Sequence, residues 1–392
     1  FPTERVRELE DNLSCRVSFM EGGIIVLSIA IDATASCTPR PTGIGRYTEA
    51  LAEALMNKGI SLSLGTRYSH FHLRKHRLHV ESANQFWIQE PIWPLCKNPD
   101  VIHVTDARVP RWPLASRRLP KVATLHDVFH ILPGLDSGHR FSTPEFQRKK
   151  IDRYRKMARD CDMIIAVSEA TRSDFLKYVE CDPAKVSVVH HGVDPIFSAS
   201  PEEVDDSCKI LQEAGIPEGG ILYVGDISSR KNLDGIIDGF LKADLGPEIP
   251  LVIAGESTFG SKELEQKILD HSPGQIVKVG WRGHDILPAL YRSSKALLFC
   301  THYEGFGLPV LEALASETPV VISRRGATSE IAGDHGDQCD PEDAETIASA
   351  LHSALARSPQ ALRMAADHAG SFTWGRCAEK TLEVYQHAME VA

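Results

Sequence analysis

Short runs of apolar, β-branched residues alternate with helix-sized segments along almost the whole chain, and this alternation constrains the fold more than any other feature. Each run has the length of a strand, and strands that are apolar throughout are typical of parallel sheets covered by helices on both faces. The runs form two sets of five: Ile24–Asp32, Val101–Val104, Val122–Leu125, Met163–Val167 and Val186–His190, then Ile221–Val224, Pro250–Ala254, Ile276–Val279, Ala296–Phe299 and Pro319–Ile322. The pattern predicts two consecutive doubly wound α/β domains.

A break in the pattern separates the two sets. Between Asp194 and Asp206, prolines, serines and an acidic cluster interrupt the alternation. With 392 residues the chain is long enough for two domains of ordinary size. We predict an N-terminal extension over 1–20, a first domain over 21–198, a second domain over 199–373 and a terminal helix over 374–392. Ligands of open α/β sheets bind at the carboxyl ends of the strands, so we expect a site in the cleft between the domains.

Composition and charge narrow the classes of function. The 43 Lys and Arg against 53 Asp and Glu give a net charge of −10, and no basic stripe suggests a nucleic-acid partner. The nine cysteines are dispersed without a C-x-x-C pair, which is typical of reduced thiols rather than of a zinc site or a disulfide framework. The longest apolar run, Ile24–Ile31, is far shorter than the ~20 residues of a membrane-spanning helix. Phe1–Met20 lacks the features of a signal peptide, so we expect a cytoplasmic protein.

Two glutamates eight positions apart, Glu304 and Glu312, flank a predicted strand-to-helix turn. The turn contains Gly305 and Gly307, and Pro309 suits a first helical position because its missing N–H costs nothing there. A helix start offers unpaired N–H groups and a partial positive charge, which favour a bound anion. We place Glu304 before this anion site and Glu312 in the first helical turn. Two carboxylates beside an anion site suit a ligand with both phosphate and hydroxyl groups, such as a nucleotide sugar.

Two plainer interpretations of these glutamates stay open. An acidic residue in a first helical turn often does no more than complement the helix dipole. A pair of carboxylates about 5–9 Å apart could also act as the acid and nucleophile of a glycosidase.

A second anion site is predicted after the strand Ile221–Val224. Arg230 and Lys231 stand just before a helix that begins near Asn232. Two cations beside a helix start can hold a diphosphate and stabilise it as a leaving group. The alternative is a solvated basic pair.

In the first domain, Gly43 and Gly45 open a predicted helix after the strand that ends at Asp32. The segment misses the dinucleotide fingerprint G-x-G-x-x-G, because position 48 is Thr and ten residues separate the strand from Gly43. Hydride transfer with a nicotinamide cofactor is therefore not indicated. The glycine turn could still present backbone N–H groups to a phosphate across the cleft.

Three further motifs contain histidine or acidic residues of the kinds found in active sites and metal sites. His126 follows the strand Val122–Leu125 at its carboxyl edge, so it faces the expected cleft, although a single His is often only packed in the core. The Asp160-Cys161-Asp162 motif lies at the amino end of a strand, which is the wrong end for a metal site in the cleft. His190-His191 has no further ligand at a useful spacing. We predict no metal site.

Taken together, these motifs resemble the family 4 retaining glycosyltransferases of the GT-B fold, especially the bacterial mannosyltransferases of surface-polysaccharide assembly. The resemblance runs from about Ile24 to Tyr385, and its most specific part is the E-x7-E element Glu304–Glu312. Supporting segments are Thr42–Tyr47, Thr124–Asp127, Ala166–Glu169, Tyr223–Leu233 and Val279–Tyr291. His191 departs from the pattern, because the family usually has Asn there.

The resemblance implies a role for each matched residue. Glu304 would contact the donor sugar, with the backbone of Gly305, Phe306, Gly307 and Leu308 around the sugar and phosphate. Glu312 would hold the ribose hydroxyls, Arg230 and Lys231 the diphosphate, and Gly43 and Gly45 would approach it from the first domain. His126 would lie near the sugar and the acceptor, and the final helix would cross back onto the first domain.

The expected activity is transfer of a hexose, most plausibly mannose from GDP-mannose, to a glycan or lipid-linked glycan acceptor, with retention of configuration and without a metal or other cofactor. Peripheral contact with the inner membrane surface would be compatible with such an acceptor. A UDP-sugar donor, a nucleotide-sugar 2-epimerase and a non-catalytic sugar-nucleotide-binding protein stay open as alternatives. The sequence does not indicate the acceptor, although loops over Asn84–Lys97 and Ile131–Phe141 are expected to form its pocket.

Overall fold

The computed structural model describes residues 27–38, 40, 42–67, 83–88, 99–109, 119–132, 143–198, 201–258, 262–271 and 274–392. The predicted extension over 1–20 and the loop segments 89–98 and 133–142 lie outside the described residues.

The first domain is built on a parallel sheet of seven strands in the order β3-β2-β1-β4-β5-β6-β7. The strands are β1 Ser28–Asp32, β2 Ser61–Arg67, β3 Asn84–Ile88, β4 Val101–Val104, β5 Lys121–Leu125, β6 Met163–Ala166 and β7 Val186–Val188. Its helices are α2 Gly43–Asn57, α3 Pro144–Asp160 and α4 Glu169–Tyr178. The order of the strands reverses at β1, so a crevice forms at the carboxyl ends of β1 and β4.

The second domain has a parallel sheet of six strands in the order β10-β9-β8-β11-β12-β13. The strands are β8 Ile221–Val224, β9 Leu251–Ala254, β10 Ile276–Lys278, β11 Ala296–Phe299, β12 Val320–Ser323 and β13 Gly336–Cys339. The helices from here to the C-terminus are α5 Pro201–Glu213, α6 Leu233–Ala243, α7 Lys262–Asp270, α8 Leu287–Ser293, α9 Leu308–Ala315, α10 Thr328–Ala332, α11 Ala344–Leu355, α12 Pro359–Gly370 and α13 Trp374–Val391. The predicted pair of doubly wound α/β domains is confirmed.

Each sheet has a hydrophobic core on both of its faces. In β1, for example, Ile29 and Ile31 pack on the side of α2, whereas Ala30 between them packs on the other side. Successive side chains of a strand point to opposite faces, so a strand that is buried on both sides must be apolar throughout. This is the physical basis of the apolar runs that mark the strands in the sequence.

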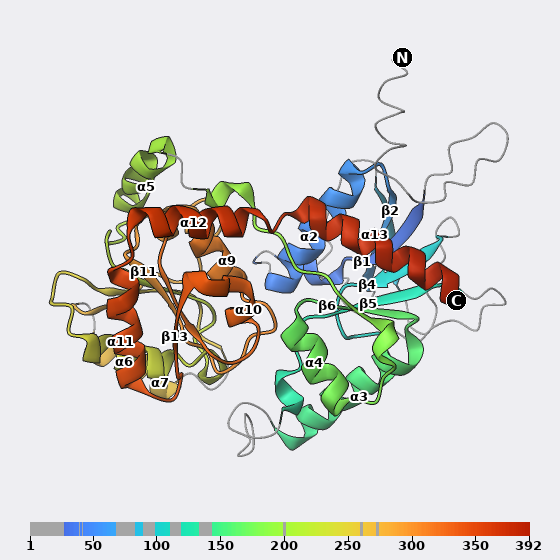
Figure 1. Ribbon diagram of the computed structural model, residues 1–392, viewed down its shortest axis with the longest axis horizontal. Coiled ribbons are helices and arrows are strands. Elements are labelled where there is room, and N and C mark those ends of the chain that lie inside the picture. Colours follow the sequence, from blue (N-terminus) through green and yellow to red (C-terminus); the bar gives the residue numbers. More distant parts are fainter. Residues whose placement is uncertain are drawn as a thin grey trace, which may run out of the picture.

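The last helix returns to the first domain, as the resemblance implied. Figure 1 shows α12 and α13 running one after the other from the second domain to the first. The ring of His103 in β4 fixes α13 to the sheet, since Nδ1 lies 2.7 Å from the Tyr385 hydroxyl and Nε2 lies 2.8 Å from the Thr124 hydroxyl. Burial lowers the pKa of His103 to about 3, so the ring is neutral and both hydrogen bonds are between uncharged groups.

Three strands differ from the sequence prediction. The predicted loop over Asn84–Lys97 is wrong for its first five residues, which form β3. β2 and β13 were also missed, because serine, glycine and aspartate interrupt their apolar character. β3 and β13 are edge strands, which need fewer apolar residues than a central strand.

Over the part of the chain that the structure describes, no helix combines the length and the apolar character that crossing a bilayer requires.

Candidate functional site

Glu304 lies in the loop between β11 and α9, at the carboxyl edge of the second sheet. Its Oε1 atom is 2.6 Å from the Nζ of Lys231 and 3.8 Å from the Nη1 of Arg230. The two cations end the turn that follows β8, and β8 is the sheet neighbour of β11. Because neighbouring parallel strands end at the same edge, residues more than 70 positions apart meet there.

This group of charges is largely shielded from water. The side chains of Glu304 and Lys231 are only 12% and 13% exposed, so their attraction is stronger than that of a surface ion pair. Burial alone would lower the pKa of Arg230, but the nearby carboxylates of Glu304 and Asp127 outweigh it and raise the pKa. The two cations are thus held in place at this edge of the sheet, where they can bind an anionic ligand.

Helix α9 begins directly behind this group. Gly307 has a φ of +100°, a backbone conformation that favours glycine, and it turns the chain into the first helical residue, Leu308. The prediction that Pro309 opens the helix is wrong by one residue, and Glu312 consequently lies in the second turn rather than the first. The positive end of the α9 dipole adds to the positive potential beside Lys231.

Glu312 is buried and its carboxylate is held from both domains. Arg46 of α2 forms an ion pair with Oε1, and the hydroxyl of Tyr291 in α8 donates a 2.9 Å hydrogen bond to Oε2. Burial would lower the pKa of Arg46, but the Glu312 carboxylate more than compensates and raises it. The fully paired carboxylate is therefore a fixed contact between the domains in this structure.

The backbone of Gly305 touches the first domain directly. A Cβ atom placed on Gly305 would lie 1.7 Å from the carbonyl oxygen of His126, so only glycine fits. The Gly305 carbonyl accepts hydrogen bonds from Ser168 Oγ at 2.7 Å and from Thr171 Oγ1 at 3.0 Å. These contacts bring the loop after β11 against the loop after β5, across the expected cleft.

His126 and Asp127 form the first-domain side of this contact. The Nε2 of His126 donates to the Thr105 carbonyl at 2.8 Å, which leaves Nδ1 as the acceptor nitrogen. Burial lowers the pKa of His126, so the ring is neutral. Burial would raise the pKa of Asp127, but Arg230 and Lys150 lower it, so Asp127 is a carboxylate that faces a cation of the opposite domain.

A third contact between the domains involves Glu330 of α10. Its carboxylate accepts hydrogen bonds from the backbone N–H groups of Glu169 and Ala170 at 2.9 and 3.0 Å, at the start of α4. The Nε2 of His190 lies 2.7 Å from the same carboxylate. These three contacts lower the pKa of Glu330, although burial alone would raise it. Glu330 thus caps a first-domain helix with a second-domain side chain.

Gly43, Gly45 and Phe306 are the remaining predicted site residues, and they lie beside the group of charges rather than in it. Gly43 and Gly45 lie in the first turn of α2, and a Cβ on Gly43 would lie 3.9 Å from the side chain of Leu308. The side chain of Phe306 is buried against the ring of His191, with ring centroids 4.6 Å apart, so only its backbone can face a ligand.

The structure thus places the predicted site residues along the facing edges of the two sheets, where Gly305 meets His126 and Leu308 lies near Gly43. Four contributors were given no role by the sequence: Arg46, Asp127, Tyr291 and Glu330. Arg46, Asp127 and Tyr291 lie inside segments that carry the resemblance, and this was a usable signal. Glu330 lies outside those segments, and its importance depends on the packing of the two domains. Within the described ranges, no group of three or more His, Cys, Asp or Glu residues could hold a metal ion.

Two facing α/β domains with a helix that crosses back define the GT-B class of glycosyltransferase folds. Sucrose-phosphate synthase from Thermosynechococcus elongatus has this fold, with a TM-score of 0.72 at 17% identity over 94% of this chain and 100% of that chain. HepE from Anabaena, solved in complex with UDP-glucose, matches with a TM-score of 0.67 at 18% identity over 92% and 99% of the two chains.

Family comparison agrees with the fold. The model described as "Glycosyltransferase Family 4" matches residues 41–197, and the model described as "Glycosyl transferases group 1" matches residues 212–369. The chain belongs to this family of glycosyltransferases. A relative, O-antigen chain mannosyltransferase B of Escherichia coli, is 25% identical over 328 residues, which cover 80% of this chain and 81% of the relative.

Proposed function

We propose that this glycosyltransferase moves a hexose, with retention of configuration, from a nucleotide sugar to a glycan or lipid-linked glycan. The observation that carries the proposal is the group formed by Glu304, Lys231 and Arg230 at the start of α9. A carboxylate that can accept hydrogen bonds from sugar hydroxyls lies beside two cations that can hold a diphosphate. The proposal includes no metal cofactor.

The chemistry of transfer fits this arrangement. Breaking the bond between sugar and diphosphate builds negative charge on the leaving group and positive charge on the sugar. Lys231, Arg230 and the positive end of the α9 dipole are fixed before the reaction and can stabilise the leaving diphosphate. We propose attack from the face of the leaving group, with the diphosphate accepting the proton of the acceptor hydroxyl. The neutral His126 and the close contact at Gly305 would help to exclude water from the sugar.

GDP-mannose is the donor that we propose, because a relative that matches 80% of this chain is a mannosyltransferase. A UDP-sugar is the second candidate, since a protein with the same fold was solved with UDP-glucose.

A thermal-shift panel of GDP-mannose, UDP-glucose, UDP-galactose, UDP-N-acetylglucosamine and ADP-glucose tests the donor. A ligand at 100 times its Kd stabilises the native state by about 2.7 kcal/mol, so the true donor should raise Tm by several degrees. We expect GDP-mannose to give the largest shift, and the Lys231→Ala variant to give none. A larger shift with a UDP-sugar than with GDP-mannose would show that the donor is that UDP-sugar. The absence of a shift with every nucleotide sugar would contradict the proposed site.

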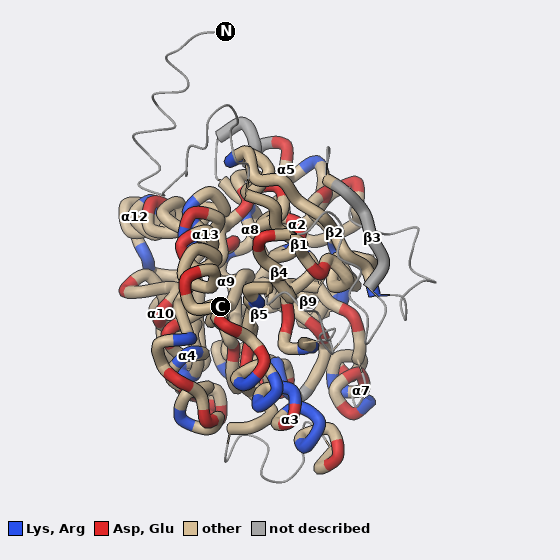
Figure 2. Tube along the Cα trace, turned by 90° about the vertical axis from the view of Figure 1, so that its right-hand side faces the viewer, with Lys and Arg blue, Asp and Glu red and all other residues tan. Residues whose placement is uncertain are grey.

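The second part of the proposal is that the protein contacts an anionic membrane surface through helix α3. Its 17 residues include seven Lys or Arg against three Asp or Glu, although the whole chain has a net charge of −10. Figure 2 shows these cations gathered along α3 at one end of the molecule. Arg148 and Arg155, seven positions apart and so on one face of the helix, are both exposed.

Sedimentation with lipid vesicles tests this contact. We expect binding to vesicles that contain phosphatidylglycerol, weaker binding at high salt, and little binding to neutral phosphatidylcholine. Replacing Arg148 and Arg155 by Glu should abolish binding, whereas Lys209→Glu, a change of the same sign on exposed α5, should not. Equal binding to both kinds of vesicle, or full binding by the double variant, would refute the role of α3.

A further inference from the structure

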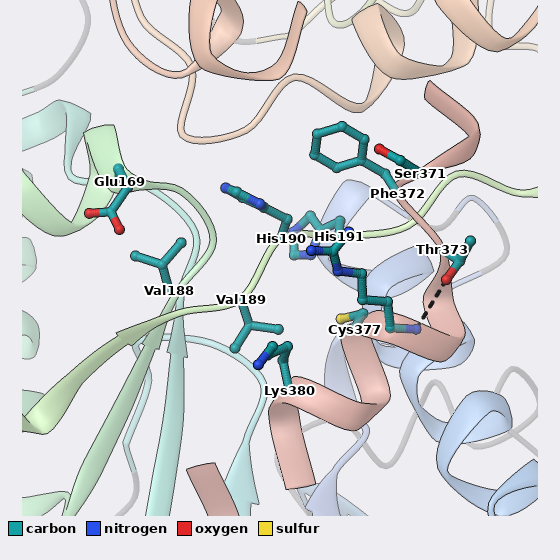
Figure 3. Close-up of a pocket in the computed structure, with 11 residues that line it drawn as sticks. Glu169, Val188, Val189, His190, His191, Ser371, Phe372, Thr373, Cys377 and Lys380 are labelled. Carbon is teal, nitrogen blue, oxygen red and sulfur yellow. Dashed lines mark hydrogen bonds between the residues drawn. The ribbon is translucent and has the colours of Figure 1, made fainter. Parts of the chain in front are cut away.

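Two segments connect the domains: the first crossing follows β7 and contains His190 and His191, and the second crossing lies between α12 and α13 and contains Phe372. A cavity of about 350 Å³ lies where these two crossings meet. Figure 3 shows its wall formed by His190 and His191 of the first crossing, Phe372 of the second crossing and Lys380 of α13. The other polar residues of the lining are Glu169, Ser371, Thr373 and Arg376. The volume is within the range of sites that bind small metabolites. None of the residues assigned to the proposed donor site lines this cavity.

The lining carries an excess of positive charge. Arg376 and Lys380 are one helical turn apart and therefore on the same face of α13. No ion pair with Arg376 occurs among the described residues, whereas Lys380 lies 2.8 Å from the carboxylate of Glu383. Glu169 is the acidic residue of the lining, and its carboxylate is 62% exposed and lies 3.8 Å from Arg172. The planar guanidinium of Arg376 is suited to binding a phosphate group through two hydrogen bonds.

His191, one of the residues that line the cavity, also has an unused polar atom. The Nδ1 of His191 is buried and has no hydrogen-bond partner in the described part of the chain. Buried polar groups nearly always have a partner, so an unsatisfied one calls for an explanation such as a ligand or a water molecule. Burial lowers the pKa of His191, so the ring is neutral and can accept or donate a hydrogen bond.

The cavity touches both segments on which the domains can move. The N–H of Val193 donates a 2.9 Å hydrogen bond to the carbonyl of Phe372, which joins the two crossings. A Cβ on Gly192 would lie 2.2 Å from the backbone nitrogen of Trp374, so the crossings are in direct contact there. The ring of His191 packs against Phe306 of the donor-site loop, with centroids 4.6 Å apart. A ligand in the cavity would therefore be one side chain away from that loop.

We propose that this cavity binds a small phosphorylated metabolite of about the size of a sugar phosphate. Arg376, with help from Lys380, holds the phosphate group. The sugar portion lies against Phe372, and His191 offers it a hydrogen bond. This site is separate from the donor site, and the proposal does not depend on which sugar the enzyme transfers.

Calorimetric titration of the full-length chain with glucose 6-phosphate, and with inorganic phosphate, tests the proposal. We expect saturable binding of glucose 6-phosphate that weakens about tenfold or more in Arg376→Ala/Lys380→Ala and in the milder Arg376→Gln variant. Arg363→Ala removes an exposed cation from the preceding helix, α12, and should leave binding unchanged. The Tm of each variant without ligand shows whether it is folded.

The donor site also binds phosphate groups under the proposed function, so Lys231→Ala is included to separate the two sites. Binding of glucose 6-phosphate that persists in Lys231→Ala and is lost in the Arg376 variants supports a binding site in the cavity. Binding that is lost in Lys231→Ala and persists in the Arg376 variants belongs to the donor site and overturns the proposal. The absence of saturable binding of glucose 6-phosphate below about 10 mM in the wild type overturns it as well.

Discussion

Replacing Glu304 or Lys231 by Ala should lower the turnover of sugar transfer by about 10²-fold or more, which corresponds to about 2.7 kcal/mol of lost transition-state stabilisation. The two side chains are 2.6 Å apart and nearly buried, so removing either one leaves the other without its partner. Lys231 is also one of the two cations that we expect at the leaving diphosphate. The measurement is kcat with the donor identified by thermal shift.

A matched control separates this effect from the loss of any ion pair. Lys242→Ala removes a lysine that lies 2.6 Å from Glu345 on the surface of the second domain, and it should leave kcat unchanged. If Lys231 and Arg230 do the work that a metal does in other transferases, the wild type should keep its activity in EDTA. Near-normal transfer by both Glu304→Ala and Lys231→Ala would show that the site has been assigned wrongly.

Gly305→Ala should have a comparably large effect for a steric reason. The added Cβ would lie 1.7 Å from the His126 carbonyl oxygen, far inside any tolerable contact. The loop cannot shift away without losing the hydrogen bonds from Ser168 and Thr171 to the Gly305 carbonyl. The domains must therefore separate, and a displacement of about 1 Å at the reacting groups can cost about 10²-fold in rate. We expect kcat/KM to fall by at least that factor.

Small-angle scattering provides a second measurement for Gly305→Ala, because separated domains increase the radius of gyration. Gly274→Ala is the control, since nothing lies within 4 Å of the Cβ that it would add. A Gly305→Ala variant that is both fully active and as compact as the wild type would rule out the closed contact as the active arrangement.

The sequence was informative wherever the signal was local. The strands Val101–Val104, Ile221–Val224 and Ala296–Phe299 were predicted with their observed bounds, because each is a central strand buried on both faces. β2 was missed although it is also central. Its alternating serines and leucines, with Gly65, do not form a continuous apolar run.

The sequence could indicate which residues belong to the site, but not which of them pair with one another across the two domains. Strand ends place Glu304 and Lys231 at one edge of one sheet, and the order of the strands then makes them neighbours. No pattern along the chain could pair Glu312 with Arg46, or Glu330 with the start of α4, because each pair joins two different domains. Such contacts depend on how the domains pack, and that is a property of the whole fold.

The return of α13 to the first domain has a consequence for biosynthesis. Helix α13 is synthesised after the whole second domain, and it supplies Cys377, Ala378, Val384, Tyr385 and Ala388 to the core of the first domain. The second sheet, by contrast, has all of its strands once Cys339 has been made. Domains usually fold in the order in which they are synthesised. Here α2 covers part of one face of the first sheet early, but the rest of that face is covered only once α13 has been synthesised. The first domain is therefore begun before the second domain and completed after it.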